Sequence, residues 1–281
     1  MSRKVISVTE ATPTIEGAGV RLHRAFGREH PRLDPFLLLD DFSSDQPDDY
    51  LAGFPWHPHR GIETITYILE GLVEHGDSMG NQGTIGVGEV QWMTAGGGIV
   101  HQEMPQRSKR LVGFQLWANL PAADKMMPPR YRDVKQTDIP TAQLADGVTA
   151  RVICGTAGGV TGPVRDIVTG PQYLDVTLAP GAALDYPAPP ECNILSYLIS
   201  GRADFGAEKK PASHRSLVIF GDGDSVRAAA GPKGARFLLV SGRPIREPVA
   251  WRGPIVMNTW EEIELAYAQL DAGTFIKKRE T

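Results

Sequence analysis

Short runs of apolar residues, or of apolar residues alternating with polar ones, recur along almost the whole chain. Most are bounded by turn residues, typically glycine with aspartate or asparagine, as in segments 75–83 and 220–225. Alternation with a period of two is typical of a β-strand that buries one face. The runs lie at 5–8, 19–26, 63–71, 88–96, 111–121, 148–155, 172–178, 192–201, 214–221 and 235–244. Many short strands at this spacing predict an all-β sandwich or barrel.

Helices are limited by the distribution of glycine and proline, which number 31 and 22 among the 281 residues. The longest stretch without either is residues 255–272, which clearly exceeds the usual helix length of about 11–12 residues. Within it, Thr259 and Glu262 have the spacing of a capping box, and Ile263, Tyr267 and Leu270 form one apolar face. The sequence therefore predicts one C-terminal helix on a β domain and excludes a helical bundle.

Two copies of one β fold are indicated by an internal repeat. Residues 66–71 (TYILEG) resemble 196–201 (SYLISG), and 113–121 resemble a segment that ends at Pro244. Between the copies, residues 121–140 carry four prolines and many charges, as expected of a connection between domains. We therefore expect an N-terminal domain at 1–130 and a C-terminal domain with the helix at 131–281.

Charge and targeting signals narrow the class of protein. The net charge is −4 with no long run of either sign, which gives no support for binding nucleic acid or a membrane surface. No segment has the apolar length of a signal peptide core or a transmembrane helix. Cys154 and Cys192 lie in apolar runs and are expected to be buried, reduced thiols. We expect a cytoplasmic protein, and a monomer if its two domains pair with each other.

The densest candidate chemistry is two pairs of residues spaced i and i+2. His57 and His59 form the first pair, and His101 and Glu103 form the second, 42 residues beyond His59. Residues two apart on an extended strand point to the same face, with Cα atoms about 6.6 Å apart. An isolated H-x-H pair is often only a surface strand, but two such pairs joined by hairpins favour one shared metal. Three imidazoles and a carboxylate suit Fe, Mn, Ni, Cu or Zn, and four ligands of six leave two positions open, as in catalytic sites.

Other residues near these motifs have weaker signals. His75 is expected on a hairpin turn, and the pattern does not decide which side of its strand His23 faces. The glycines at 96–98 indicate tight backbone packing, because no helix pattern follows that would make them a phosphate site. The apolar residues that flank the motifs either line a pocket or are plain core: Phe54, Trp56, Trp92 and Met93.

The two motifs resemble the metal-binding motifs of the pirin family, a branch of the cupin superfamily. They read HPHRGIETITYILEG and GEVQWMTAGGGIVHQEMP, and the resemblance extends to residues 33–42 and 247–259, so it covers nearly the whole chain. The superfamily pattern is met by Gly53, His57, His59, Glu63 and Gly71, and then by Gly88, Gly96 and His101. Thr94 stands where most cupins have proline, a departure that pirin-like sequences share.

This resemblance implies a bicupin, with two jelly-roll-like β-barrels in tandem and one metal in the first. The ligands it implies are His57, His59, His101 and Glu103, with one divalent metal per chain. Iron(II) is the first expectation, and Mn, Ni, Cu, Co or Zn are alternatives. Glu63 is expected to share the inward direction of His57 and His59, but in pirin-like proteins Glu103 takes its role as a ligand. Glu63 is then expected beside the ligands or in a salt bridge, with Arg60 as the candidate partner.

In the second copy, the repeat places other residues at the ligand positions. Offsets of 130 and 126 bring these positions onto Pro187, Pro189, Asn193, Arg227 and Ala229. None of these side chains suits a metal of this kind, so the second barrel is expected to be structural. His214 is then a lone surface or capping histidine.

The resemblance also implies an activity. Pirin-like proteins are similar to quercetin 2,3-dioxygenases, which open a flavonol ring with O2 and release carbon monoxide. Here a metal would bind the flavonol hydroxyl, and Glu103 would take its proton as catalytic base. The alternative is a metal-dependent regulatory or redox-sensing protein that binds a transcription factor or a metabolic enzyme. A third possibility is a metal cupin with another small-molecule activity, such as an isomerase.

Overall fold

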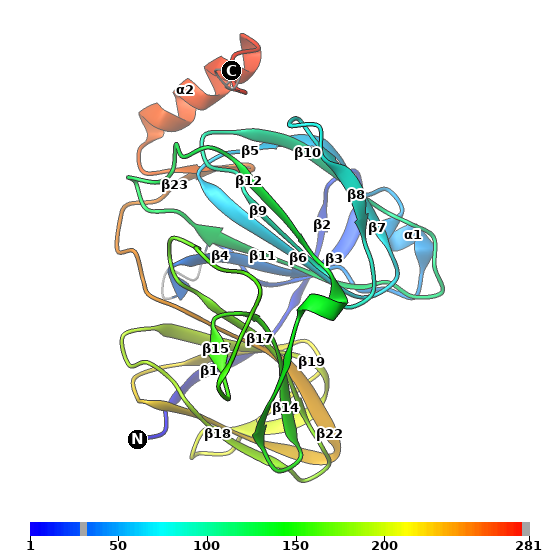
Figure 1. Cartoon of the computed structure of the whole chain (residues 1–281), viewed down its shortest axis with the longest axis vertical. Helices are drawn as coiled ribbons and strands as arrows, with labels where there is room; N and C mark the ends of the chain where they lie inside the picture. Colours follow the sequence, from blue (N-terminus) through cyan, green and yellow to red (C-terminus); the bar gives the residue numbers. More distant parts are fainter. Residues whose placement is uncertain (29–32, 277–281) are drawn as a thin grey trace. The chain divides into compact units, whose positions relative to one another are not determined.

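The protein forms two compact units, and neither is continuous in the sequence (Figure 1). The computed structural model describes residues 1–28 and 33–276. The histidine unit comprises residues 13–24, 36–136 and 245–276, and the apolar unit comprises 1–12, 25–28, 33–35 and 137–244. The division into domains at 1–130 and 131–281 stays a prediction, but by contacts residues 245–276 belong with the histidine motifs.

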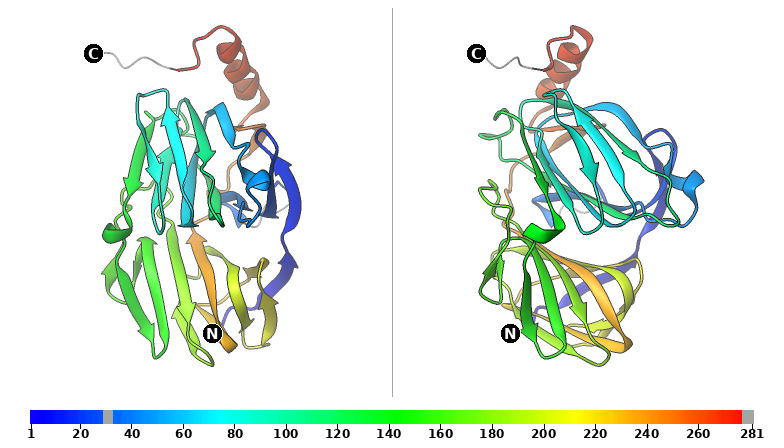
Figure 2. Two further views of the ribbon diagram at one scale, coloured as in Figure 1. Left: turned by 90° about the vertical axis from the view of Figure 1, so that its right-hand side faces the viewer. Right: turned by 45° about the vertical axis from the view of Figure 1, so that its right-hand side comes forward.

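The histidine unit is built from two antiparallel sheets. The smaller has the order β5-β10-β7-β8, and the larger has the order β12-β9-β6-β11-β4-β3-β2. Figure 2 shows their strands around one interior. Hydrogen bonds from β6 and β11 to β10 confirm that the two sheets face each other. The strands are β2 (Thr12–Glu16), β3 (Val20–Phe26), β4 (Phe36–Asp41), β5 (Phe54–His59), β6 (Ile62–Glu70), β7 (Val73–Asp77), β8 (Gln82–Ile85), β9 (Val90–Thr94), β10 (Ile99–Pro105), β11 (Val112–Asn119) and β12 (Arg130–Val134).

An apolar cluster fills one part of this interior. Its members come from strands of both sheets, from residues directly beside them, and from the short helix α1 (Pro47–Tyr50), which the sequence did not predict. They are Val20, Leu22, Phe42, Tyr50, Ile68, Val73, Ile85 and Leu111. Burial of these side chains stabilises the pairing of the two sheets, at about 25 cal/mol for each Å² of apolar surface removed from water.

The apolar unit has one nine-stranded antiparallel sheet and a small hairpin. The N-terminal strand β1 (Val5–Glu10) pairs with β21 in this sheet, whose main path is β1-β21-β19-β22-β17-β14-β13. A large apolar cluster forms its core. The remaining elements are the 3-10 turn η2 (Gln136–Asp138), β13 (Thr141–Ala145), β14 (Val148–Cys154), β15 (Thr156–Ala157), β16 (Val160–Thr161), β17 (Gln172–Leu178), β18 (Ala183–Pro187), β19 (Asn193–Phe205), β20 (Lys210–Ser213), β21 (Ser216–Phe220) and β22 (Ser225–Gly242).

The C-terminal segment consists of a small hairpin and one helix. Strands β23 (Ala250–Arg252) and β24 (Ile255–Met257) pair with each other and contact helix α2 (Trp260–Asp271). The predicted capping box is confirmed, since the Thr259 side chain accepts from the Glu262 backbone and the Glu262 side chain accepts from the Thr259 backbone. Helix α2 packs through Ile263 and its neighbours onto the hairpin.

Most of the fold expected from the pattern is confirmed. The chain is all-β with one C-terminal helix, although its sheets do not close into hydrogen-bonded barrels. The expected connection at 121–140 contains the unit boundary, but part of it is β12, an edge strand paired with β9. This strand was not predicted, because the prolines and charged residues of the segment are typical of a loop. Neither cysteine forms a disulfide, and Cys154 is buried as predicted, but Cys192 is only partly buried. In the part of the chain that the structure describes, no helix has the length and apolar character needed to span a membrane.

Candidate metal centre

His57, His59 and His101 meet on the interior side of the smaller sheet. Strands β5 and β10 are neighbours, and His101 is the direct cross-strand partner of His57. The ring centroids of His57 and His101 lie 4.4 Å apart, and those of His59 and His101 lie 5.0 Å apart. The ligand atoms of the three residues all lie within 4.8 Å of one another. The hairpins between the two motifs therefore bring them face to face, as their spacing predicted.

Backbone carbonyls orient two of the three imidazoles. Nδ1 of His57 lies 2.9 Å from the carbonyl oxygen of Pro55, and Nδ1 of His59 lies 3.1 Å from that of Pro254. A proton on each Nδ1 satisfies these carbonyls and leaves each Nε2 with a free lone pair. Such an outer hydrogen bond is typical of metal-binding histidines, whose tautomer it fixes.

The free nitrogens fit a metal ion. Nε2 of His57 and Nε2 of His59 are 3.0 Å apart. Two nitrogens bound at about 2.1 Å to one ion, with an angle near 90°, lie about 3.0 Å apart. Among the described residues, neither ring nitrogen of His101 has a hydrogen-bond partner, although the residue is buried. A buried polar group without a partner costs about 1–3 kcal/mol, and a metal ion would supply the missing partner.

Burial keeps two of these histidines neutral. It is the main cause that lowers the pKa of His59 and of His101 well below the ordinary value, and the neighbouring histidines lower both further. Only the neutral imidazole can donate a lone pair to a metal. At neutral pH, His59 and His101 are therefore already in the form that binds metal.

Glu103 lies near the histidine cluster but is not a member of it. Its Oε1 accepts a hydrogen bond of 2.6 Å from the Thr66 hydroxyl, and its Oε2 accepts one of 2.7 Å from Nε2 of Gln115. Gln115 is itself held by Nε1 of Trp117, whose ring is perpendicular to the His59 ring, with the two ring centroids 5.0 Å apart. The carboxylate is thus oriented by two neighbouring strands of the larger sheet, β6 and β11, and each of its oxygens has a lone pair to spare.

Glu63 does not point toward the histidines, so its predicted inward direction is wrong. It lies on β6 an odd number of residues from Thr66, which contacts Glu103, and so it faces the other side of the sheet. Its partner is the Thr94 hydroxyl at 2.6 Å. The expected pair with Arg60 is not formed either, because Arg60 donates to Gly97 and Phe275. The chain turns at Gly61, with φ of +77°, and this turn resets the alternation between β5 and β6.

The weaker candidates have mixed outcomes. His75 is not on a turn but within β7, buried beside the Tyr131 hydroxyl and 3.6 Å from Asp133. The tight packing predicted at 96–98 is confirmed, since a Cβ at Gly96 would lie 2.1 Å from the Met127 carbonyl oxygen. His214 is an exposed residue whose Nδ1 contacts the Ile199 carbonyl, as expected of a capping histidine. His23 lies on β3 and is partly buried.

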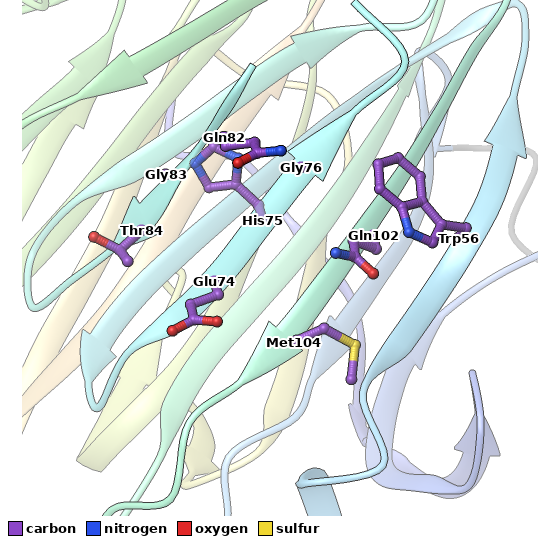
Figure 3. Close-up of a pocket in the computed structure, with 9 residues that line it drawn as sticks. All are labelled: Trp56, Glu74, His75, Gly76, Gln82, Gly83, Thr84, Gln102 and Met104. Carbon is purple, nitrogen blue, oxygen red and sulfur yellow. The ribbon is translucent and has the colours of Figure 1, made fainter. Parts of the chain in front are cut away.

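The aromatic residues around the motifs do not form one pocket. Trp92 and Met93 are fully buried core, whereas Trp56 is 54% exposed. Trp56 borders a surface pocket of about 430 Å³ on the smaller sheet (Figure 3). Gln102 and Met104 line this pocket and alternate along β10 with His101 and Glu103, so their side chains project from the opposite face. The pocket is therefore separate from the histidine cluster.

Two features of the centre were not predicted from the sequence. Pro254, which holds His59, lies 195 residues further along the chain. Lys125 is a buried cation 1% exposed, although it stands in a charged, proline-rich segment that indicates a surface connection. The only sequence signal for Pro254 was that the pirin-like resemblance extends through residues 247–259.

Among its described residues, the apolar unit has no comparable centre. Within residues 1–28 and 33–276, the three histidines form the only cluster of three or more possible metal ligands. At the positions that the repeat aligned with ligands, Arg227 pairs with Asp185 and Ala229 lies in the sheet opposite Ala183. These two positions therefore offer no metal ligand, and the absence of a metal from the apolar unit stays a prediction.

A two-sheet cupin domain with three convergent histidines, joined to a second cupin domain, defines the class of bicupins. The pirin family model matches residues 19–118, and the model of the pirin C-terminal cupin domain matches residues 173–276. The chain belongs to the pirin family.

Relatives match the chain over almost its whole length. It is 44% identical over 276 residues to a pirin-like protein of Caulobacter vibrioides, covering 97% of this chain and 99% of the relative. It is 44% identical over 271 residues to human pirin, covering 94% and 91%. The crystal structure of a quercetin 2,3-dioxygenase from Acinetobacter baumannii is similar, with a TM-score of 0.89, 31% identity, and coverage of 98% of this chain and 99% of that one.

Proposed function

We propose that this protein is a metal-dependent dioxygenase of the quercetin 2,3-dioxygenase type, which cleaves flavonol-like aromatic enols with O2. The observation that carries the proposal is the convergence of Nε2 of His57 and His59 with the two unpartnered nitrogens of His101. The similarity to the Acinetobacter enzyme supports the choice of reaction. The proposal includes one divalent metal per chain, with iron(II) as the first candidate.

The proposed metal ligands are His57, His59, His101 and Glu103. The three imidazoles require no rearrangement, because two of them are already held by carbonyls and His59 and His101 are kept neutral by burial. Glu103 would bind through the spare lone pair of one carboxylate oxygen, while Thr66 and Gln115 keep their hydrogen bonds to it. A divalent metal at this position supplies a Lewis acid, which lowers the pKa of a substrate hydroxyl.

The chain's own residues would then handle the proton. Glu103 is the proposed catalytic base, taking the proton of the flavonol 3-hydroxyl onto a carboxylate oxygen. Thr66 and Gln115 fix the direction of this carboxylate, and a general base must lie within hydrogen-bond reach of the proton it takes. Trp117, beside His59, offers an apolar wall that would keep water from the reacting enolate.

The test is turnover with defined metals. Metal-free protein is loaded anaerobically with Fe(II), Mn, Ni, Cu or Co, mixed with quercetin, and exposed to O2, while loss of flavonol absorption is followed. We expect repeated turnover with at least one metal, no turnover with His101→Ala, and normal turnover with the surface control His214→Ala. Metal binding without turnover for all five metals would overturn the dioxygenase proposal. It would favour the alternative of a metal-dependent regulatory or redox-sensing partner of another protein.

A further inference from the structure

The C-terminal hairpin lies directly on the first histidine motif. The Pro254 carbonyl accepts from Nδ1 of His59, and the Val256 N–H donates to the Arg60 carbonyl at 3.1 Å. Arg60 and Ile255 also form a parallel β-bridge. The hairpin turn thus holds the side chain of His59, and β24 holds the backbone of the next residue, Arg60.

Lys125 joins the hairpin to the motif through a buried ammonium group. Its Nζ donates to the Gly61 carbonyl at 2.9 Å, to the Val256 carbonyl at 3.0 Å and to Oδ1 of Asn119 at 2.6 Å. These three acceptors use all three N–H groups of the ammonium. Losing the ammonium would remove a donor from both backbone carbonyls, and the Gly61 carbonyl would keep only the Leu120 N–H, at 3.4 Å. A buried carbonyl left without a donor costs about 1–3 kcal/mol.

A second cation holds the end of the segment. The Arg60 guanidinium, which follows His59 in the chain, donates to the Gly97 carbonyl at 2.8 Å and to the Phe275 carbonyl at 3.2 Å. It also lies 4.2 Å from the centroid of the Phe275 ring, in the geometry of a cation–π contact. The segment is therefore held at both ends by residues next to His59.

The fit between the motif and the hairpin leaves no spare space. A Cβ at Gly61 would lie 1.9 Å from the Val256 carbonyl oxygen, and one at Gly98 would lie 3.0 Å from the carbonyl oxygen and the ring of Phe275. Trp117 lies between His59 and Trp251, with ring centroids 5.0 and 5.9 Å away. A movement of the hairpin would therefore be transmitted to the His59 ring through both its hydrogen bond and its packing.

We propose that residues 250–275 are a positioning element for the metal centre, and that docking of this segment and metal binding are coupled. The Pro254 carbonyl keeps the proton of His59 on Nδ1 and so presents Nε2 to the metal. Lys125 and Arg60 are positioning residues that act through the hairpin. The inference rests on the metal-binding part of the proposed function and not on turnover of quercetin.

Coupling is reciprocal, so metal binding must stabilise the docked hairpin by the same factor by which docking strengthens metal binding. Loss of an outer partner of a metal-binding histidine typically weakens metal affinity by about 10–100-fold. We therefore expect metal binding to reduce opening of the hairpin by a comparable factor. Hydrogen–deuterium exchange measures this opening on the full-length protein without any variant.

The first experiment measures hydrogen–deuterium exchange of the full-length wild-type protein with and without nickel(II). We expect nickel to slow exchange of amides in residues 251–257 by about tenfold, since docking and binding are linked. The β15–β16 hairpin, in the apolar unit, is the internal control and should be unchanged. Unaltered exchange of 251–257 on nickel binding would overturn the inference.

The second experiment compares Lys125→Met with Lys135→Met, a matched change of a half-exposed lysine that pairs with Glu89. We expect Lys125→Met to weaken nickel binding by about tenfold and to change the visible spectrum of bound cobalt(II), whereas Lys135→Met does neither. Wild-type nickel affinity and an unchanged cobalt spectrum in Lys125→Met would contradict the coupling of the hairpin to the metal centre. If Lys125→Met does not fold, the exchange measurement decides. If the wild type binds no nickel, the proposed metal site itself fails, which is a different result from a bound metal without coupling.

Discussion

The Thr66 hydroxyl donates a hydrogen bond of 2.6 Å to Oε1 of Glu103, across the interior between the two sheets of the histidine unit. Gln115 holds the other oxygen from the neighbouring strand. A carboxylate restrained at both oxygens has one orientation before any metal binds. A substitution of Thr66 therefore tests directly whether Glu103 is a ligand of the metal.

We expect Thr66→Val to weaken metal binding. Valine has nearly the same shape but cannot donate, so Oε1 of Glu103 loses its partner and the carboxylate loses its fixed direction. The expected decrease in affinity is about tenfold, the usual lower range for loss of a partner of a metal ligand. Competition with a chelator of known affinity measures it. Thr64→Val, two residues earlier on the same strand, is the control; equal affinities of the two variants would contradict a role for Glu103 as ligand.

His101 gives a second prediction because neither of its buried nitrogens has a partner in the described structure. We expect His101→Leu to keep the stability of the metal-free protein, since an apolar side chain removes an unsatisfied polar group. The variant should lose all stabilisation by metal. For the wild type, this stabilisation is about 2.7 kcal/mol at a metal concentration 100 times the Kd.

Thermal denaturation with and without nickel(II), together with elemental analysis, measures both parts. The wild type should contain one metal per chain, because the apolar unit has no second cluster among its described residues. A nickel-dependent increase in Tm that persists in His101→Leu would show that the metal binds elsewhere. His214→Ala, which changes an exposed histidine of the apolar unit, should behave as the wild type.

The sequence was sufficient for the parts of the centre that depend on local geometry. His57, His59 and His101 follow from i and i+2 spacing on strands, because alternation along a strand decides which side chains share a face. The direction of Glu63 could not be obtained in this way, since the turn at Gly61 interrupts the alternation. A positive φ at a glycine is not visible in a pattern of apolar and polar residues.

Contacts between distant segments could not be predicted for a different reason. Pro254 acts through its carbonyl oxygen, which every residue has, so its identity gives no signal of the contact with His59. Lys125 resembles any surface lysine until the fold surrounds it with three acceptors. The one external indication was the extent of the family resemblance, which included the hairpin.

Lys125 also predicts a dependence of stability on pH. Burial lowers the pKa of this lysine to about 8 from its ordinary value of 10.5. Between these two values the unfolded chain binds more protons than the folded one, so the free energy of unfolding rises with pH. For this residue alone, the increase from about pH 7.5 to 9.5 is about 2 kcal/mol. Below pH 8 both states are protonated and the contribution levels off.

Urea denaturation across this range, with wild type and Lys125→Met compared at each pH, isolates the contribution. The difference in the free energy of unfolding should shift in favour of the wild type by about 2 kcal/mol as pH rises. Lys135→Met provides the reference for an exposed lysine. A difference that is constant with pH would mean that the Lys125 pKa is not lowered in the folded protein.

Gly61 is the position where a single added carbon should separate the hairpin from the motif. Its φ is +77°, and a Cβ there would lie 1.9 Å from the Val256 carbonyl oxygen, which is backbone and cannot turn aside. Gly80 also has a positive φ, of +89°, but a Cβ there would meet nothing within 4 Å. Both alanine variants therefore include the backbone strain, of about 1 kcal/mol, and only Gly61→Ala includes the clash.

We expect Gly61→Ala to lower the free energy of unfolding by more than about 3 kcal/mol and to speed hydrogen exchange of amides 251–257. Gly80→Ala should lower the free energy of unfolding by only about 1 kcal/mol. Equal losses of stability in the two variants, measured by urea denaturation, would show that the hairpin can move away from Gly61 at little cost.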